Sequence, residues 1–376
     1  MEGAPAGFLL ALLSVGSAAF SNIGMKKSLF SLGLGAMLAA TVPASAEPAR
    51  LEVQEVADTG SMPKGAILSH DGKKFYVTNF GQLDKRNVTI YDAHTLAELD
   101  HLDVPGVIVE SVLSADGKTL FISNFRRSSV MFVDLATKKV THEIKTGTHP
   151  KVLVASPDGK NLFVANWASK SVTQIDIATA EVVRSLDVGR QPRGMTMTKS
   201  GKLFVANFFG DSIDVFEGKD FDQTHRLPSC KCPRHLALSP DDKTLYISCL
   251  NKSQLHAMDV ASETITHKVQ IGNAPKSIDV SKDGRYVYSA DYGESRSVSI
   301  VDTHDWTSRV FTIPGMDRGS GVAVGPDGKH ALVTGWYDKH IYLVGFEGSG
   351  GHPDESKKKM RRWQFLPFHE DGGNGA

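Results

Sequence analysis

The sequence lacks an excess of charge of either sign, since Lys plus Arg and Asp plus Glu number 42 each. Its overall charge therefore points to neither nucleic acid nor a membrane surface, although a local basic cluster can still create a field. Beyond the N-terminal leader it also lacks an apolar run of the roughly 20 residues that span a bilayer. No membrane span is expected.

Contiguous catalytic and cofactor motifs are also missing. The chain contains no G-x-S-x-G elbow, phosphate-binding loop, H-E-x-x-H or C-x-x-C-H haem-attachment sequence. No cofactor and no metal site are predicted from such motifs. An enzyme remains possible, because a propeller-type site is assembled from separated residues and needs no contiguous string.

The N-terminal region has the features of an export signal. Met25 is followed by Lys26 and Lys27, an apolar stretch over 29–40, and a small-residue ending at Ala46. This order is typical of a secretory signal peptide. We predict cleavage near Ala46 and a periplasmic or secreted protein. Residues 1–24 are interpreted as lying upstream of a true start at Met25, so that 1–46 form leader and signal. The residue directly after the cleavage site is not cysteine, so no lipid anchor is expected.

One apolar five-residue run recurs seven times after the leader. The copies are FYVTN (75–79), LFISN (120–124), LFVAN (162–166), LFVAN (203–207), LYISC (245–249), VYSAD (287–291) and ALVTG (331–335). Each follows a turn such as Asp71-Gly72, and successive turns lie 41 to 45 residues apart. A further run follows each copy, as in VTIYD and VSIVD. Repeats of this length indicate a stacked or circular architecture.

These runs are rich in β-branched and aromatic residues and are bounded by Gly, Asp and Asn, which indicates strands. With one segment upstream and one downstream, each repeat supplies four antiparallel strands, which is a propeller blade. The sequence therefore predicts an all-β fold, a seven-bladed β-propeller over 47–347. The stretch 51–60 matches a fourth blade strand that the seventh repeat lacks. We expect this N-terminal strand to close the ring. Residues 348–376, Gly-rich and basic, are expected to form a flexible tail.

The order G-x-x-P-x-G, S-P-D-G, a YVTN-like run and V-x-x-x-D resembles the YVTN repeat family, over about 60–345. The chain is similar to exported YncE-like propellers. That resemblance implies seven blades, no obligatory cofactor and no general function. Two repeats depart from the pattern, with Ile108 and Gly319 in place of the proline.

Equivalent positions of the repeats can be read as rings around the channel. The G-x-x-P loop and the end of the YVTN run are expected at one mouth, opposite the Asp-Gly turns. The residue after the proline position is basic in five of seven repeats: Lys64, Val109, Lys151, Arg193, Arg234, Lys276 and Ser320. Arg318 lies close by. Like charges repel unless an anion is near, so this ring is a candidate site for an anionic ligand.

The residue after the YVTN run is aromatic in six of seven repeats: Phe80, Phe125, Trp167, Phe208, Leu250, Tyr292 and Trp336. Such aromatics either wedge neighbouring blades together or stack on a planar ligand. Trp167 and Trp336 are taken as candidate ligand contacts. Cations and aromatics on one face suit an anionic small molecule, a protein partner or single-stranded nucleic acid. We expect a monomer.

All three cysteines fall in one repeat. Cys230 takes the glycine position of its G-x-x-P loop, Cys232 follows two residues later, and Cys249 replaces the usual asparagine. An exported protein favours a disulfide from Cys230 or Cys232 to Cys249, with one thiol left free. Unpaired structural thiols, or a zinc site that includes His235, are the alternatives left open.

Two histidines beside the proline position, His149 and His235, are candidate acid-base groups or ligands at the same mouth. They support a rival hypothesis, because the repeats resemble the propellers of lactonases, amine dehydrogenases and haem-carrying nitrite reductases. The preferred hypothesis is an exported, non-enzymatic binding module whose basic mouth takes an anionic ligand or a protein. The alternative is a cofactor-binding or hydrolytic enzyme.

Overall fold

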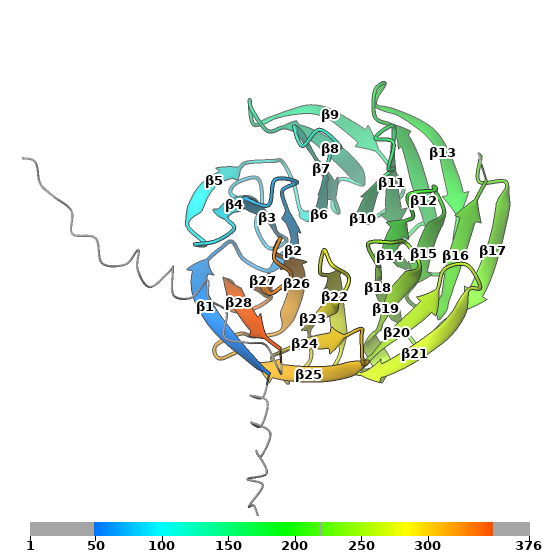
Figure 1. Ribbon diagram of the computed structural model, residues 1–376. Coiled ribbons are helices and arrows are strands. Elements are labelled where there is room, and N and C mark those ends of the chain that lie inside the picture. Colours follow the sequence, from blue (N-terminus) through cyan, green and yellow to red (C-terminus); the bar gives the residue numbers. More distant parts are fainter. Residues whose placement is uncertain (1–48, 219, 349–376) are drawn as a thin grey trace, which may run out of the picture. The chain divides into compact units, whose positions relative to one another are not determined.

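The computed structural model describes residues 49–218 and 220–348. The predicted leader (1–46) and the predicted tail from residue 349 onward lie outside the described residues. Within them, 28 strands form seven four-stranded antiparallel sheets. Figure 1 shows the sheets arranged as blades around a central axis, which confirms the predicted all-β, seven-bladed propeller.

In each of the first four blades, the strands follow one another in sequence from the innermost to the outermost. The first contains β2 (Pro63–Leu68), β3 (Lys74–Asn79), β4 (Val88–Asp92) and β5 (Glu98–Leu102). The second contains β6 (Ile108–Leu113), β7 (Thr119–Asn124), β8 (Ser129–Asp134) and β9 (Lys139–Lys145). The third contains β10 (Pro150–Ala155), β11 (Asn161–Asn166), β12 (Ser171–Asp176) and β13 (Glu181–Asp187). The fourth contains β14 (Pro192–Met197), β15 (Leu203–Asn207), β16 (Ser212–Glu217) and β17 (Gln223–Pro228).

The remaining blades follow the same plan. The fifth contains β18 (Pro233–Leu238), β19 (Thr244–Cys249), β20 (Gln254–Asp259) and β21 (Thr264–Gln270). The sixth contains β22 (Pro275–Val280), β23 (Tyr286–Asp291), β24 (Ser297–Asp302) and β25 (Thr307–Thr312). The seventh contains β26 (Gly319–Val324), β27 (His330–Gly335), β28 (His340–Glu347) and β1 (Arg50–Asp58). A 3₁₀ turn, η1 (Leu250–Lys252), is the one helix in the described ranges, and none there could span a bilayer.

The ring closes as expected. β1 pairs antiparallel with β28, from Arg50 opposite Glu347 to Asp58 opposite His340, with an irregularity near Gln54. Figure 1 shows the blue N-terminal strand beside the orange C-terminal one. The last blade is thus built from both ends of the described chain, and a sheet edge at β28 is covered.

The core lies between blades. Each of seven hydrophobic clusters draws its residues from two adjacent blades. The YVTN-like strands are buried on both faces, as in β15, where all five residues are buried. A blade therefore buries its apolar faces only when it stacks on neighbours, which explains the seven near-identical runs in the sequence.

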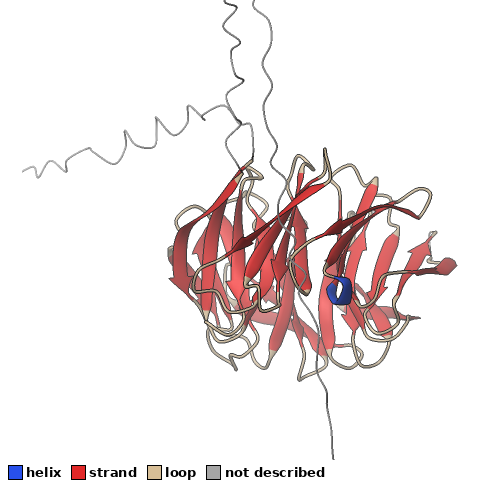
Figure 2. Ribbon diagram, turned by 90° about the horizontal axis from the view of Figure 1, so that it is seen from below, coloured by secondary structure: helices blue, strands red, loops and turns tan. Residues whose placement is uncertain are grey.

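The two mouths of the channel have different loops. In the first blade Pro63 pairs with Asn79, so the start of β2 and the end of β3 lie at one mouth, while the turn that contains Gly72 lies at the other. The seven innermost strands contact one another in sequence around the axis, and β26 contacts β2. Figure 2 shows the strands running between two layers of loops. The basic and aromatic positions therefore meet at the mouth formed by the G-x-x-P loops, here called the proline mouth.

Candidate functional site

A repeated backbone hydrogen bond builds the proline mouth. In every blade the N–H of the residue after the YVTN run donates to the carbonyl of the residue just before the innermost strand. Examples are Trp167 to His149, at 3.0 Å, and Trp336 to Arg318, at 2.9 Å. This bond fixes each aromatic side chain beside the first residues of the innermost strand. The aromatic and basic rings of the sequence are therefore neighbours in space.

The five basic residues of the predicted ring converge on one cavity, here called the chamber. They are Lys64, Lys151, Arg193, Arg234 and Lys276. All except Arg193 are buried, with Lys151 only 8% exposed. The chamber leaves about 20 Å³ of free space. Positive side chains from five blades are thus enclosed together instead of reaching into solvent.

A carboxylate that sequence reasoning missed lies in the same chamber. Glu110, from β6, forms an ion pair with Lys64 of the neighbouring blade. A β-carbon on Gly65 would overlap the Glu110 carboxylate, so glycine makes room for it. Glu110 directly follows Val109, which is the ring position of its blade. Among the seven residues that follow a ring position, Glu110 is the one with a carboxylate. A charged residue that occurs in only one of seven equivalent positions was the sequence signal that could have identified Glu110.

The basic side chains differ in their partners. Lys64 binds Glu110, and the Lys276 ammonium donates to Oγ of Ser320 at 2.6 Å. Within the described part of the chain, Lys151, Arg193 and Arg234 have neither a hydrogen-bond acceptor for their charged groups nor a carboxylate partner. Three consecutive blades therefore direct basic groups that lack a hydrogen-bond acceptor at one cavity.

Aromatic faces are the contacts that these cations do make. Nζ of Lys151 lies 4.3 Å from the ring centroid of Phe125 and 5.6 Å from that of Trp167. The guanidinium carbons of Arg193 and Arg234 lie 4.8 and 5.7 Å from the Phe208 centroid. Cation–π contacts of this kind offset part of the lost hydration but supply no hydrogen-bond acceptor.

Burial and crowding weaken the basicity of the chamber. Burial, together with the charges of Lys64 and Arg193, lowers the pKa of Lys151 to about 6. Burial lowers the pKa of Arg193 to about 10, and that of Lys276 falls well below its usual range for the same reason. Burial also lowers the pKa of Lys64, although Glu110 opposes the change. Each shift means that positive charge is costly here without an added anion.

The aromatic residues that lie over the cations of the chamber are here called the collar: Phe80, Phe125, Trp167, Phe208, Tyr292 and Trp336. Phe80 links its neighbours, with centroid distances of 5.8 Å to Phe125 and 5.7 Å to Trp336. Trp336 in turn lies 6.3 Å from Tyr292. All but Phe208 are half-buried, and the adjacent Phe209 and Tyr337 are 49% and 52% exposed. The collar thus both covers cations and presents aromatic surface.

The other predicted site residues divide between chamber and collar. His235 lines the chamber, and burial lowers its pKa. His149 lies in the collar, stacked on Phe125 at a centroid distance of 4.1 Å. Arg318 lies over Tyr292 at 5.4 Å and is not among the residues that line the chamber. The residues that the sequence analysis assigns to one mouth thus lie in two layers, the chamber and the collar above it.

A second, wider cavity of about 480 Å³ lies toward the opposite mouth, between the fourth, fifth and sixth blades. His235 lines both cavities. Asp279 also lines the wider cavity, and burial raises its pKa to about 6. Its carboxylate accepts the backbone N–H groups of Val280 and Val324, at 2.9 and 2.8 Å, so it ties the sixth blade to the seventh.

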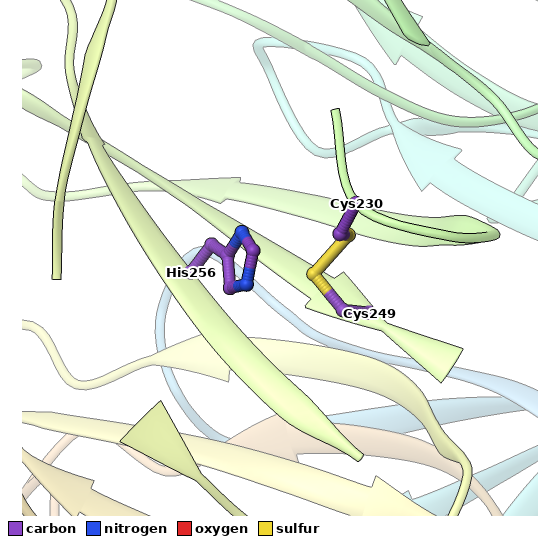
Figure 3. Close-up of side chains that lie close together, drawn as sticks. All are labelled: Cys230, Cys249 and His256. Atoms are coloured by element: carbon purple, nitrogen blue, oxygen red, sulfur yellow. A yellow bond between two sulfur atoms is a disulfide. The ribbon is translucent and has the colours of Figure 1, made fainter. Parts of the chain in front are cut away.

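The structure shows which cysteines form the disulfide, a choice that the sequence left open. Cys230 and Cys249 form a disulfide with a Cα–Cα distance of 5.8 Å, and Cys232 is a free, buried thiol. Figure 3 shows the imidazole of His256 beside the two sulfur atoms. The histidine next to the sulfurs is thus His256, which sequence reasoning did not single out, and both sulfurs are engaged in the covalent bond.

Comparison with known proteins agrees with this architecture. A family model described as YNCE-like beta-propeller matches residues 106–334, which is more than half of the chain. The chain is 29% identical over 105 residues to antigen Lp49 of Leptospira interrogans, and the match covers 24% of this chain and 23% of Lp49. The chain thus spans about a quarter of the length of that relative.

Solved structures show the same fold in more distant proteins. A chain of Kuenenia stuttgartiensis hydrazine synthase superposes with a TM-score of 0.66 at 19% identity, covering 77% of this chain and 97% of that one. The Cps50 (Swd1) β-propeller domain of Myceliophteria thermophila gives 0.67 at 14% identity, covering 79% and 99%. Identities this low establish a common fold alone.

Proposed function

From the premise that this chain belongs to the YNCE-like β-propeller family, we propose that it is an exported, non-enzymatic binding module whose chamber holds an anionic ligand. The ligand enters at the proline mouth, where the G-x-x-P loops of seven blades meet. Export is supported by the signal-like sequence that ends at Ala46. The propeller supplies a rigid frame, and the loops and strand starts supply the site.

One observation carries the proposal, namely the cations that lack partners. Five basic side chains line the chamber with a single carboxylate, and Lys151, Arg193 and Arg234 have no acceptor among the described residues. Buried charges in proteins are normally paired, because an unpaired one loses its hydration without compensation. An anion between these groups would supply the missing acceptors and restore the basicity that burial removes.

The two arginines favour an oxyanion over a simple halide. A guanidinium presents planar pairs of N–H donors that match the two oxygens of a carboxylate or phosphate. Arg193 and Arg234 come from adjacent blades, and both guanidinium groups contact the ring of Phe208. Their donors are therefore held in place before a ligand arrives, which reduces the entropy lost on binding.

The test compares matched triple variants. Lys151, Arg193 and Arg234 are changed to Met in one protein, and the exposed Lys139, Lys160 and Lys243 are changed to Met in the control. Binding of acetate, phosphate and citrate is followed by calorimetry at constant ionic strength. The chamber variant should lose binding at least about tenfold, while the control, which loses the same number of basic residues, should keep it. Equal binding by the two variants would refute the chamber as the site.

A further inference from the structure

The chamber already holds one anionic group, and its identity is informative. Glu110 places a carboxylate among the five cations and binds Lys64 across the boundary between the first and second blades. Gly65 leaves the space that this carboxylate occupies. The cations are therefore arranged around a group of this size and charge. A ligand carboxylate would meet donors that the protein's own carboxylate has left unused.

The size of the chamber limits how much of a ligand can enter. The free space is about 20 Å³, which is room for only about one or two water-sized atoms. A compact anionic group can be accommodated with small movements of the flexible lysines. Any larger body attached to it must remain outside, at the proline mouth.

The collar is what such a body would contact. Five of its six rings are half-buried, and Tyr337 and Phe209 extend the aromatic surface with exposed fractions of 52% and 49%. The ring contacts run without interruption from Tyr292 through Trp336 and Phe80 to Phe125. Exposed aromatic surface that is contiguous with a site is typical of a binding surface for apolar or planar groups.

Joining these observations, we propose that the ligand is a small carboxylic acid with an aromatic or other planar body. Its carboxylate lies in the chamber between Lys151, Arg193 and Arg234, and its body stacks on the collar. This inference rests on the proposed function, because it names the chemical class of the ligand for the same chamber. Charge complementarity selects the head group, and the aromatic surface selects the body.

Four probes separate head group from body: acetate, phenylacetate, phenylacetamide and inorganic phosphate. Calorimetry on the protein without residues 1–46 should show phenylacetate binding at least about tenfold more tightly than acetate, because the ring buries against aromatic faces. Phenylacetamide, which has the same shape without the charge, should bind at least about tenfold more weakly than phenylacetate.

The outcomes distinguish the two proposals. Equal affinities for acetate and phenylacetate, or phosphate tighter than both, would overturn the carboxylic-acid inference and leave the anion-binding chamber intact. Phenylacetamide as tight as phenylacetate would overturn the inference as well. Failure of every anion to bind would overturn both proposals.

A pair of exposed positions provides a matched control. Tyr337→Ala removes an aromatic side chain next to the collar that is 52% exposed, whereas Val310→Ala removes an apolar side chain that is 48% exposed on the outer strand β25. Tyr337→Ala should lower the affinity for phenylacetate about threefold or more and leave the affinity for acetate unchanged. Val310→Ala should change neither. Equal effects of Tyr337→Ala on the two ligands would place the aromatic body elsewhere.

Discussion

Glu110 and Gly65 occupy neighbouring blades, and a β-carbon on Gly65 would overlap the Glu110 carboxylate. The absence of a side chain in one blade thus allows a charge from the next to reach Lys64. Glu110 lowers the net positive charge of the chamber and competes with any anion that enters it. Its removal should therefore reveal how strongly the chamber attracts an external anion.

The Glu110→Gln variant should bind acetate more tightly than the parent protein. The amide keeps the size and an acceptor oxygen for Lys64 but removes the competing charge. An increase of about tenfold corresponds to ~1.4 kcal/mol, the order expected for one charge at short range in a partly desolvated site. Calorimetry near neutral pH measures it. A weaker affinity in this variant would mean that Glu110 organises the donors instead of competing for them.

Acetate affinity should fall as the pH rises. The pKa of Lys151 is lowered to about 6 in the ligand-free protein, and a bound carboxylate favours the ammonium form. The complex therefore holds more protons than the free protein above about pH 6, so binding takes up protons and weakens with increasing pH. Calorimetry in buffers of different ionisation enthalpy reports this uptake.

Lys151→Arg is the matched test of that assignment. Arginine keeps the positive charge throughout the range, so its pH dependence should be shallower than that of the parent. Some slope should remain, because the pKa values of Lys64 and Lys276 are also lowered. An unchanged slope in Lys151→Arg would show that another group takes up the proton.

Asp291 should make the propeller less stable at higher pH. Burial raises its pKa to about 7, although Ser289, Ser297 and Ser299 donate hydrogen bonds to it. The folded protein thus binds a proton that the unfolded chain releases near pH 4, so the free energy of unfolding falls as the pH rises from about 4 to about 7.

Asp291→Asn removes this pH dependence, because the amide has no proton to lose. Urea unfolding should show the variant more stable than the parent at about pH 8, by up to about 4 kcal/mol, and similar to it at about pH 4. The substitution restores the asparagine found at the equivalent positions 79, 124, 166 and 207. Parallel pH profiles for the two proteins would contradict the assignment.

Breaking the disulfide should destabilise the fifth blade. The double variant Cys230→Ser/Cys249→Ser should lose about 3 kcal/mol of unfolding free energy, as expected for a loop closed over 19 residues. The first, third and fourth blades have glycine and asparagine at these two positions, and a β-carbon on Gly60 would lie 2.6 Å from Cγ of Asn79. Cys230→Gly/Cys249→Asn recreates that packing.

The Gly/Asn double variant should therefore recover part of the loss seen with the two serines. Denaturant unfolding of both variants, with Cys232→Ala as a control outside the bond, measures the difference. Similar instability of the two double variants would mean that the Gly–Asn contact contributes little and that the covalent bond alone stabilises this blade.

Much of the fold was predictable because every blade buries the same kind of apolar strand against its neighbours. The copies of the YVTN run are buried on both faces, so substitutions there preserve apolar size and the period stays visible. The disulfide was also within reach. Cys230 and Cys249 stand at the glycine and asparagine positions, which contact each other in other blades, whereas Cys232 stands at neither.

Glu110 was missed for a geometric reason. Strand alternation would place Val109 toward the channel and Glu110 away from it. However, the pairing of β6 with β7 shifts register between Ile108 and Ser111, and an irregularity of this kind disturbs the alternation. Both Arg234 and the next residue, His235, line the chamber for the same reason. A repeat pattern read from sequence cannot show such a bulge.

The closing strand has a consequence for how a chain is completed. The side chains of Arg50 and Glu347 bond across 297 residues of sequence, so β1 meets its partner only after nearly the whole propeller has been synthesised. Pairing over such separations is slow, because a long loop must be closed before any contact forms. A chain cut short before β28 leaves β1 without a partner and exposes unpaired sheet edges that promote aggregation. Closure therefore distinguishes full-length molecules from truncated ones.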